Sequence, residues 1–385
     1  MPENARIPEW SRDIDDSASA AKILHGVDGG HDGLPASREP LSSPPTPVRR
    51  RQLSSEEYVK GVLEHDRTIL ARTITLIESN AASHITCAQD VLKQLLPHTG
   101  KSIRVGITGV PGVGKSTFIE ALGCYLCQKG HRVAVLTVDP SSSLSRGSIL
   151  GDKTRMERLA RAEQCFIRPS PSGGTLGGVA GKSRETILVC EAAGFDVILL
   201  ETVGVGQSEV TARSMVDFML LLLITGAGDE LQGLKKGVIE LADALVIHKA
   251  DGENVARAEA LRSEYSQALH YLTPFTEGWT PEVYTCSSLS EKGIPEIWDV
   301  IQRFIIVTTE SGRFDARRRA QNREWLHVML EEALRQRFYH HSEVARRLPA
   351  IEQMVLDGVL PVTTAVRELF SIFYATEGRA NLSAK

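Results

Sequence analysis

The sequence contains no apolar stretch long enough to cross a membrane. Its longest apolar run, residues 218–224, spans seven residues, whereas a transmembrane helix needs about 20. The first residues do not combine a basic start with an apolar stretch, and their acidic side chains argue against a transit peptide. We therefore expect no membrane partner and a cytoplasmic location.

Cysteines and excess positive charge are also scarce. Six cysteines in 385 residues are too few for a disulfide framework, which favours a reducing compartment. Cys124, Cys127 and His131 are spaced i, i+3 and i+7, but a metal site would need a fourth ligand, so buried thiols packed on a sheet are the simpler interpretation. The net charge of −4 indicates no nucleic-acid partner.

Composition and pattern divide the chain into four parts. Residues 1–54 hold seven of the 17 prolines among Gly, Ser and Asp, which predicts a disordered tail that cannot bury enough apolar surface to order. Residues 55–100 show apolar positions at helical spacing and predict an N-terminal helical segment. Strands alternate with helices over residues 101–308 and predict a central α/β domain, and residues 309–385 predict a C-terminal helical arm.

Seven short apolar runs are candidate strands. They are residues 103–108, 133–138, 165–168, 196–201, 217–224, 244–248 and 283–286. Most are continuously apolar, as expected for a parallel sheet covered by helices on both faces. We predict an α/β fold: a P-loop NTPase with a doubly wound, mostly parallel sheet, flanked by N-terminal and C-terminal helical segments. Ligands of such sheets bind at the carboxyl ends of the strands.

The most specific motif is a phosphate-binding loop between the first predicted strand and a helix. Its pattern, G-x-x-x-x-G-K-S, has the strand–loop–helix context that the motif requires. Its glycines let backbone N–H groups point at phosphate oxygens. Lys115 can reach the β- and γ-phosphates, and the Ser116 hydroxyl can bind Mg²⁺. The predicted nucleotide-binding residues here are Gly109, Val110, Pro111, Gly112, Val113, Gly114, Lys115, Ser116 and Thr117.

Acidic residues follow two of the other strands and predict a metal site. Asp139 comes after the second strand and Glu201 ends the fourth, where a carboxylate can hold Mg²⁺ directly or through water. Asp152, in a charged loop, can organise the metal or the attacking water. Gly204 lies three residues after Glu201 and can donate its N–H to a γ-phosphate. The predicted metal ligands are Ser116, Asp139 and Glu201.

The residue after Gly204 bears on the rate of hydrolysis. Val205 is aliphatic and cannot orient a water molecule, unlike the glutamine found there in Ras-like enzymes, and Gln207 lies two residues later. We therefore expect slow intrinsic hydrolysis of GTP to GDP and phosphate, stimulated by a partner. The predicted catalytic residues are Lys115, Asp152, Glu201, Gly204 and Gln207.

Two later loops predict that the base is guanine. His248-Lys249-Ala250-Asp251 resembles the N-K-x-D motif of GTPases, with His in place of Asn. The Asp251 carboxylate can accept from both N1–H and the 2-amino group of guanine, a pair of donors that adenine lacks. Histidine can donate one bond but cannot reproduce both amide contacts. Ser287, Ser288 and Leu289 resemble the S-A-L/K loop that supports guanine, with Ser288 replacing Ala.

From residue 55 to 385 the chain resembles the MeaB/ArgK-type G-protein chaperones, the methylmalonic aciduria type A protein-like family. The blocks that carry the resemblance are residues 106–117, 138–142, 151–156, 168–180, 201–209 and 228–237. The resemblance implies a GTPase that uses GTP/GDP and Mg²⁺. It also implies a chaperone that gates adenosylcobalamin delivery to methylmalonyl-CoA mutase, or a related cobalamin-dependent acyl-CoA mutase, and protects that enzyme.

The resemblance further implies a homodimer joined through the C-terminal helices and a mobile switch over residues 228–237. The cobalamin-binding pattern D-x-H-x-x-G is missing from the sequence, so adenosylcobalamin is expected only through the partner mutase. Two alternatives stay open: a metallochaperone GTPase for another metalloenzyme, and an ArgK-like ATP-dependent kinase linked to amino-acid transport. Asp251 argues against ATP, and no His-rich or Cys-rich delivery segment is visible.

Overall fold

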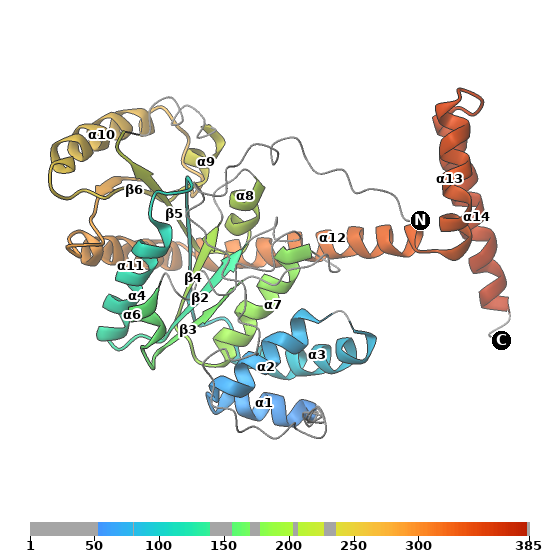
Figure 1. The fold of residues 1–385 in the computed structure, drawn as a ribbon, viewed down its shortest axis with the longest axis horizontal. Coiled ribbons are helices and arrows are strands. Elements are labelled where there is room, and N and C mark those ends of the chain that lie inside the picture. The colour runs from blue at the N-terminus through green and yellow to red at the C-terminus, as the bar shows by residue number, and fades with distance from the viewer. Residues whose placement is uncertain are drawn as a thin grey trace, which may run out of the picture. The chain divides into compact units, whose positions relative to one another are not determined.

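A parallel seven-stranded sheet lies at the centre of the described part of the chain, in the order β3-β2-β4-β1-β5-β6-β7 (Figure 1). The strands are β1 (Ile103–Gly109), β2 (Val133–Val138), β3 (Cys165–Arg168), β4 (Val197–Thr202), β5 (Phe218–Ile224), β6 (Ala244–His248) and β7 (Val283–Thr285). The predicted fold class is confirmed, and each predicted strand end lies within one residue of the observed one. The computed structural model describes residues 53–79, 81–138, 156–169, 178–202, 207–226 and 236–382.

Helices cover both faces of the sheet, which explains why the central strands are apolar on both sides. They are α1 (Ser55–Leu63), α2 (Arg67–Glu78), α3 (Ala82–Leu95), α4 (Lys115–Gln128), α6 (Glu157–Ala160), α7 (Gly178–Ala192), α8 (Gln207–Arg213), α9 (Lys236–Leu241), α10 (Asn254–Leu269), α11 (Ile294–Glu310), α12 (Arg313–Tyr339), α13 (Ser342–Leu356) and α14 (Val362–Leu382), with a 3₁₀ turn η2 at Leu96–His98. One apolar cluster joins α4 and α11 to the sheet, and a second joins α7 to the opposite face.

The N-terminal helices α1 to α3 share the second of these clusters with the sheet. Ser54 caps α1 in a capping box with Glu57, and Asp66 caps α2 through the N–H groups of Thr68 and Ile69. Their apolar side chains meet α7 and the α7 side of β2, β3 and β4. The segment is therefore anchored on the α/β core by apolar packing.

The C-terminal helices divide into an anchored and a separate part. The first turns of α12 dock on the sheet through polar contacts: Gln321 is buried, and its Nε2 donates to the Val216 carbonyl at 2.8 Å. Beyond that, α12 leads to α13 and α14, which pack on each other through their own small apolar cluster (Figure 1). Among the helices described, none is both long and apolar enough to span a membrane.

Candidate nucleotide-binding site

The loop between β1 and α4 lies at the carboxyl end of the sheet, as the motif predicts. Gly109 ends β1 with a φ of 149°, and a Cβ built on it would lie 2.5 Å from the Leu222 carbonyl oxygen of β5. Only glycine allows the chain to leave the strand so close to its neighbour. Gly114 has a φ of 99°, and a Cβ there would lie 2.7 Å from Cε1 of His248. The loop is therefore seated against β5 and the end of β6.

Lys115 turns its ammonium group back over this loop. Its Nζ donates to the Gly109 carbonyl at 2.8 Å and to the Val110 carbonyl at 3.3 Å. Burial lowers the pKa of Lys115, while the carboxylates of Glu201 and Glu209 act in the opposite direction. A buried cation beside backbone donors is suited to receive phosphate oxygens, because an added negative charge offsets its desolvation.

Ser116 and Glu201 meet at the start of α4. The Ser116 Oγ donates to Oε1 of Glu201 at 2.8 Å, across 85 residues of sequence. Glu201 is in this position because β4 pairs with β1, with Glu201 opposite Ile107. A hydroxyl and a carboxylate are oxygen ligands of the kind that Mg²⁺ prefers. The donor set present therefore fits the predicted metal.

His248 is the buried last residue of β6 and bridges two loops. Its Nδ1 lies 2.7 Å from the Val113 carbonyl oxygen, and its Nε2 lies 2.7 Å from Oγ of Ser288. The Phe118 ring packs edge-on against the imidazole at 6.1 Å. Burial lowers the pKa of His248. Both ring nitrogens thus have protein partners. The substitution of His for the Asn of the N-K-x-D motif did not predict these two contacts.

Lys249 extends the contact between the base loops, residues 248–251 and 287–289, and the phosphate loop, residues 109–117, whereas Asp251 contacts Ser287 within the base loops. Lys249 has a φ of 58°, and its Nζ donates to the Gly112 carbonyl at 3.0 Å. Oδ2 of Asp251 accepts from Oγ of Ser287 at 2.5 Å. His248 and Lys249 therefore contact the phosphate loop, although they lie more than a hundred residues away from it in sequence.

The remaining predicted residues fall into three groups. Pro111, Thr117 and Leu289 have exposed side chains, whereas Val113 is buried in the core. Gln207 is the first residue of α8, and its side chain is not among those that the structure describes. Asp139, Asp152, Gly204 and Val205 lie outside the described residues, as does most of the 228–237 block. Their predicted roles stay predictions.

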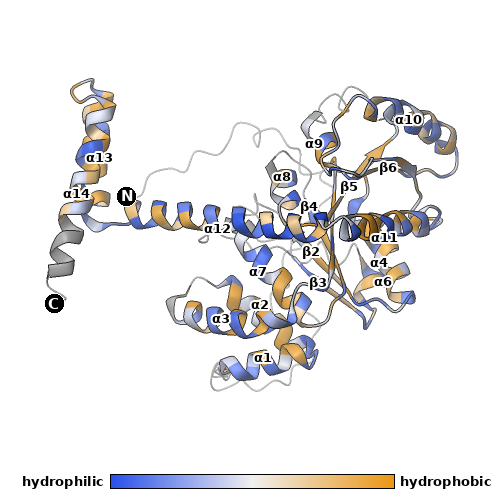
Figure 2. Cartoon of the chain, turned by 180° about the vertical axis from the view of Figure 1, so that it is seen from behind, coloured by the Kyte–Doolittle hydropathy of each residue, from blue (hydrophilic) through white to orange (hydrophobic). Residues whose placement is uncertain are grey.

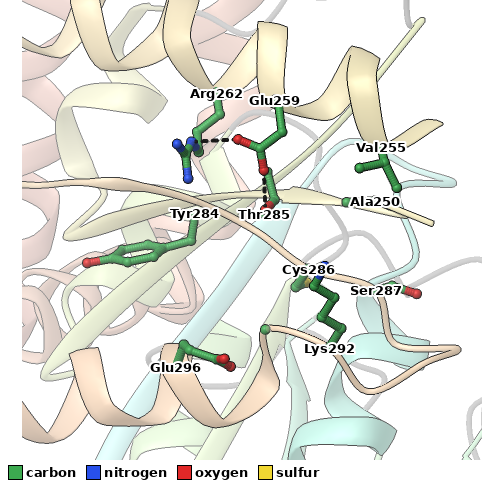
Figure 3. A pocket seen from close by; sticks show the side chains of 11 residues that line it. Ala250, Val255, Glu259, Arg262, Tyr284, Thr285, Cys286, Ser287, Lys292 and Glu296 are labelled. Atoms are coloured by element: carbon green, nitrogen blue, oxygen red, sulfur yellow. Dashed lines mark hydrogen bonds and ion pairs between the residues drawn. The ribbon is translucent and has the colours of Figure 1, made fainter.

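A pocket that no motif predicted lies beside the base loops, between α10, β7 and the start of α11 (Figure 3). Its volume is about 230 Å³. Inside it Glu259 accepts from Oγ1 of Thr285 at 3.0 Å and pairs with Arg262 at 3.1 Å. Ser287 lines the pocket and also contacts Asp251. Its lining comes from three elements, so no contiguous sequence signal marks it.

Among the residues that the structure describes, the cysteines of α4 belong to no metal site. Within the part of the chain that the structure describes, no group of three or more His, Cys, Asp or Glu side chains is placed to hold a metal ion. Cys124 and Cys127 are partly buried, and burial raises the pKa of Cys127 to about 11. Such thiols pack as small apolar groups.

A P-loop after β1, a carboxylate at the end of β4 and a Lys-x-Asp loop after β6 together define a P-loop GTPase. The chain belongs to the MeaB family: it matches the family described as "Methylmalonyl Co-A mutase-associated GTPase MeaB" over residues 70–343. The resemblance seen in the motifs is thereby confirmed, and so is the assignment of the chain as a GTPase.

Individual relatives cover most of the chain. A putative GTPase of Caulobacter vibrioides is 53% identical over 316 residues, which are 81% of this chain and 97% of that protein. The mitochondrial methylmalonic aciduria type A homolog of Mus musculus is 43% identical, over 84% of this chain and 80% of that protein. A solved structure titled as a LAO/AO transport system kinase matches with a TM-score of 0.67 and 38% identity, covering 83% of this chain and 97% of that one.

Proposed function

We propose that this protein is a guanine-nucleotide switch that binds GTP with Mg²⁺ and hydrolyses it slowly. The observation that carries the proposal is the direct contact between the base loops and the phosphate loop, where the Lys249 ammonium reaches the Gly112 carbonyl at 3.0 Å. Asp251 accepts from N1–H and the 2-amino group of guanine, and Lys249 lays its stem along the base. Ser287 holds the Asp251 carboxylate in place.

The phosphate end of the site uses charges and backbone dipoles. Lys115 exchanges its loop carbonyls for β- and γ-phosphate oxygens, and the N–H groups of the loop and of the first turn of α4 point at the same oxygens. Ser116, Glu201 and Asp139 hold Mg²⁺, which when bound neutralises negative charge on the phosphates. Asp152, Gly204 and Gln207 are proposed to contact the γ-phosphate or the attacking water.

Nucleotide titration tests the proposed base selectivity. With Mg²⁺ present, the protein is expected to bind GDP at least about 100-fold more tightly than ADP, because adenine leaves the Asp251 carboxylate without its two donors. Asp251→Asn should abolish most of this preference, whereas the exposed neighbour Glu253→Gln should retain it. Equal affinity for GDP and ADP would refute the proposal.

Single-turnover measurements test the proposed rate. Val205 offers no side-chain group to orient water, so the protein alone should hydrolyse bound GTP slowly, with an increase when its partner is added. Fast hydrolysis by the protein alone would show that another residue positions the water.

We propose a cobalamin-dependent acyl-CoA mutase as that partner. The names of the family and of the mouse relative point to methylmalonyl-CoA mutase chemistry. In this role GTP binding and hydrolysis gate adenosylcobalamin delivery to the mutase and protect it, and the cofactor stays with the partner. A cytoplasmic location is part of this proposal. Nucleotide-dependent complex formation with purified methylmalonyl-CoA mutase, followed by transfer of adenosylcobalamin, tests it; no binding in any nucleotide state counts against it.

We also propose four parts along the sequence: a tail over 1–54, a helical segment over 55–100, a GTPase domain over 101–308 and a homodimerisation arm over 309–385. The support is the exposed apolar surface of the arm. Leu326, Leu330 and Leu334 recur at four-residue spacing on α12 and are 58%, 49% and 67% exposed, so they form one stripe. Figure 2 shows apolar positions recurring along α12. A second copy of the arm would bury this stripe.

A further inference from the structure

The two departures from the guanine-nucleotide pattern are in direct contact. His248 stands where GTPases carry Asn and Ser288 where they carry Ala, and the two side chains are joined by a 2.7 Å hydrogen bond between Nε2 and Oγ. Both are nearly completely buried, at 2% and 7% exposure. An Ala at position 288 would offer no hydroxyl to the imidazole. The imidazole of His248 and the hydroxyl of Ser288 therefore form a hydrogen bond that an Asn–Ala pair could not make.

The partners of His248 determine its tautomer. The Val113 carbonyl oxygen can only accept, so Nδ1 carries the hydrogen and donates at 2.7 Å. Nε2 is then a lone-pair acceptor, and the Ser288 hydroxyl donates to it. The imidazole is neutral in this arrangement, consistent with the lowering of its pKa by burial. Neither nitrogen is left to contact the base.

The neighbouring serine makes a parallel contact. Oγ of Ser287 donates to Oδ2 of Asp251 at 2.5 Å, so adjacent serines hold both ends of the 248–251 loop. His248 in turn holds the phosphate loop through Val113 and fills the space beside Gly114. A chain of contacts therefore runs from the 287–289 loop through His248 to the phosphate loop.

We propose that His248 and Ser288 act as one positioning unit that couples the base loops to the phosphate loop. In this protein the unit replaces the Asn–Ala combination of the GTPase pattern, and nucleotide affinity depends on the pair rather than on either residue. The inference rests on the proposed guanine-nucleotide binding, and it assigns His248 a positioning role in place of a contact to the base.

A double-mutant cycle on the full-length protein tests this coupling. The variants are His248→Asn, Ser288→Ala and the two combined, with GDP affinity as the readout. Ser288→Ala leaves a buried acceptor without its donor and His248→Asn leaves a buried hydroxyl without its acceptor, so each should weaken GDP binding about ten-fold. The double variant should recover to within about three-fold of the parent, because it restores a complementary pair. Ser290→Ala, an exposed serine in the same loop, is the matched control and should leave GDP affinity unchanged.

Effects that add in the double variant would overturn the coupling. The parent protein separates this from failure of the proposed function: a parent that prefers GDP over ADP but gives an additive cycle contradicts only the inference, whereas a parent without that preference contradicts the proposed function.

Nitrogen NMR of histidine-labelled protein supplies a readout that does not depend on the variants' nucleotide binding. The resonance absent from His248→Asn identifies the residue, and the parent should show the Nδ1–H tautomer. Ser288→Ala, which removes the donor to Nε2, should change that resonance. An Nε2–H tautomer in the parent would contradict the assigned hydrogen bonds and, with them, the proposed coupling.

Discussion

The guanidinium of Arg318 in α12 lies on the carboxylate of Asp217, the residue before β5. Its Nη2 is 2.6 Å from Oδ2 and its Nε is 2.8 Å from Oδ1. The same group donates to the carbonyls of Gly100 and Ser102, which precede β1. The C-terminal arm is therefore anchored at the amino ends of the central strands, while the proposed nucleotide-binding loops lie at their carboxyl ends.

This contact predicts a large stability loss in Arg318→Ala. The variant leaves the buried Asp217 carboxylate without its countercharge, and we expect the free energy of unfolding to fall by about 3 kcal/mol. Denaturant unfolding measures it. Arg346→Ala removes an exposed arginine of α13 that pairs with Glu343 and should cause no measurable change. Equal effects of the two substitutions would contradict the role assigned to Arg318.

Lys115→Met should separate binding from stability. The variant loses the cation that faces the phosphates, so GDP affinity should fall about 100-fold or more. Stability without nucleotide should stay equal or rise, because the variant no longer buries a charge whose desolvation lowers the pKa of Lys115. Nucleotide titration and thermal unfolding give the two values. Lys129→Met, at the exposed end of the same helix, is the control for loss of charge, and unchanged GDP binding in Lys115→Met would count against the phosphate site.

Glu201→Gln should reduce the contribution of Mg²⁺ to nucleotide binding. In the parent, removal of Mg²⁺ with EDTA should weaken GDP affinity, since Ser116 and Glu201, which lie within hydrogen-bond distance of each other, are the proposed oxygen ligands of the metal. In the variant the same treatment should have little effect, because a neutral amide is a poorer ligand than a carboxylate. Glu296→Gln, an exposed change on α11, should behave like the parent. A full response to EDTA in Glu201→Gln would exclude Glu201 as a metal ligand.

Acidification should destabilise the nucleotide-free protein partly through His248. Burial lowers the pKa of this imidazole and the nearby Lys249 lowers it further, while the Val113 carbonyl and Asp251 act against the shift. The unfolded chain therefore binds this proton from about pH 6.5 downward, before the folded chain does. The free energy of unfolding should fall as the pH falls through this window.

The His248→Asn variant should lose less stability than the parent between about pH 7 and pH 5, because it lacks that titration. Urea unfolding at several pH values, without nucleotide, gives the comparison. His327→Gln, in an exposed position of α12, should keep the pH dependence of the parent. If the free energy of unfolding changed equally with pH in the parent and in His248→Asn, burial would not lower the pKa of His248.

Charges on the apolar stripe of α12 should dissociate the proposed dimer. Leu330→Glu with Leu334→Glu places two carboxylates where a second arm would pack, and sedimentation should show a monomer with unchanged helix content. His327→Glu introduces a single carboxylate next to the stripe and should leave the dimer intact. A parent protein that is monomeric at all concentrations would contradict the proposed arm function.

The strands and the phosphate loop could be predicted because their signals are local. A continuously apolar run such as residues 218–224 is removed from water on both faces only inside a sheet that helices cover on both sides. The glycine spacing around Lys115 specifies a turn whose backbone angles favour glycine. The contact between Ser116 and Glu201, the proposed metal ligands, required one further step. Each residue follows from its own motif, and the rule that parallel strands end at the same edge brings them together.

The environment of His248 could not be predicted in this way. The sequence shows that His replaces Asn and that Ser replaces Ala, but the two positions are 40 residues apart and no local pattern links them. The same holds for the pocket beside β7 and for the contact of Arg318 with Asp217, which joins residues 101 apart.

The order of amino acids thus suffices for the fold class and the family, and it supplies the proposal of which loops bind the nucleotide, because each depends on spacing within a short segment. The hydrogen-bond partners of His248, and with them its tautomer and its role, arise only when β6, the phosphate loop and the 287–289 loop come together. Hydrogen bonding is directional and acts over about 3 Å, so it depends on the folded arrangement of segments that are distant in the chain.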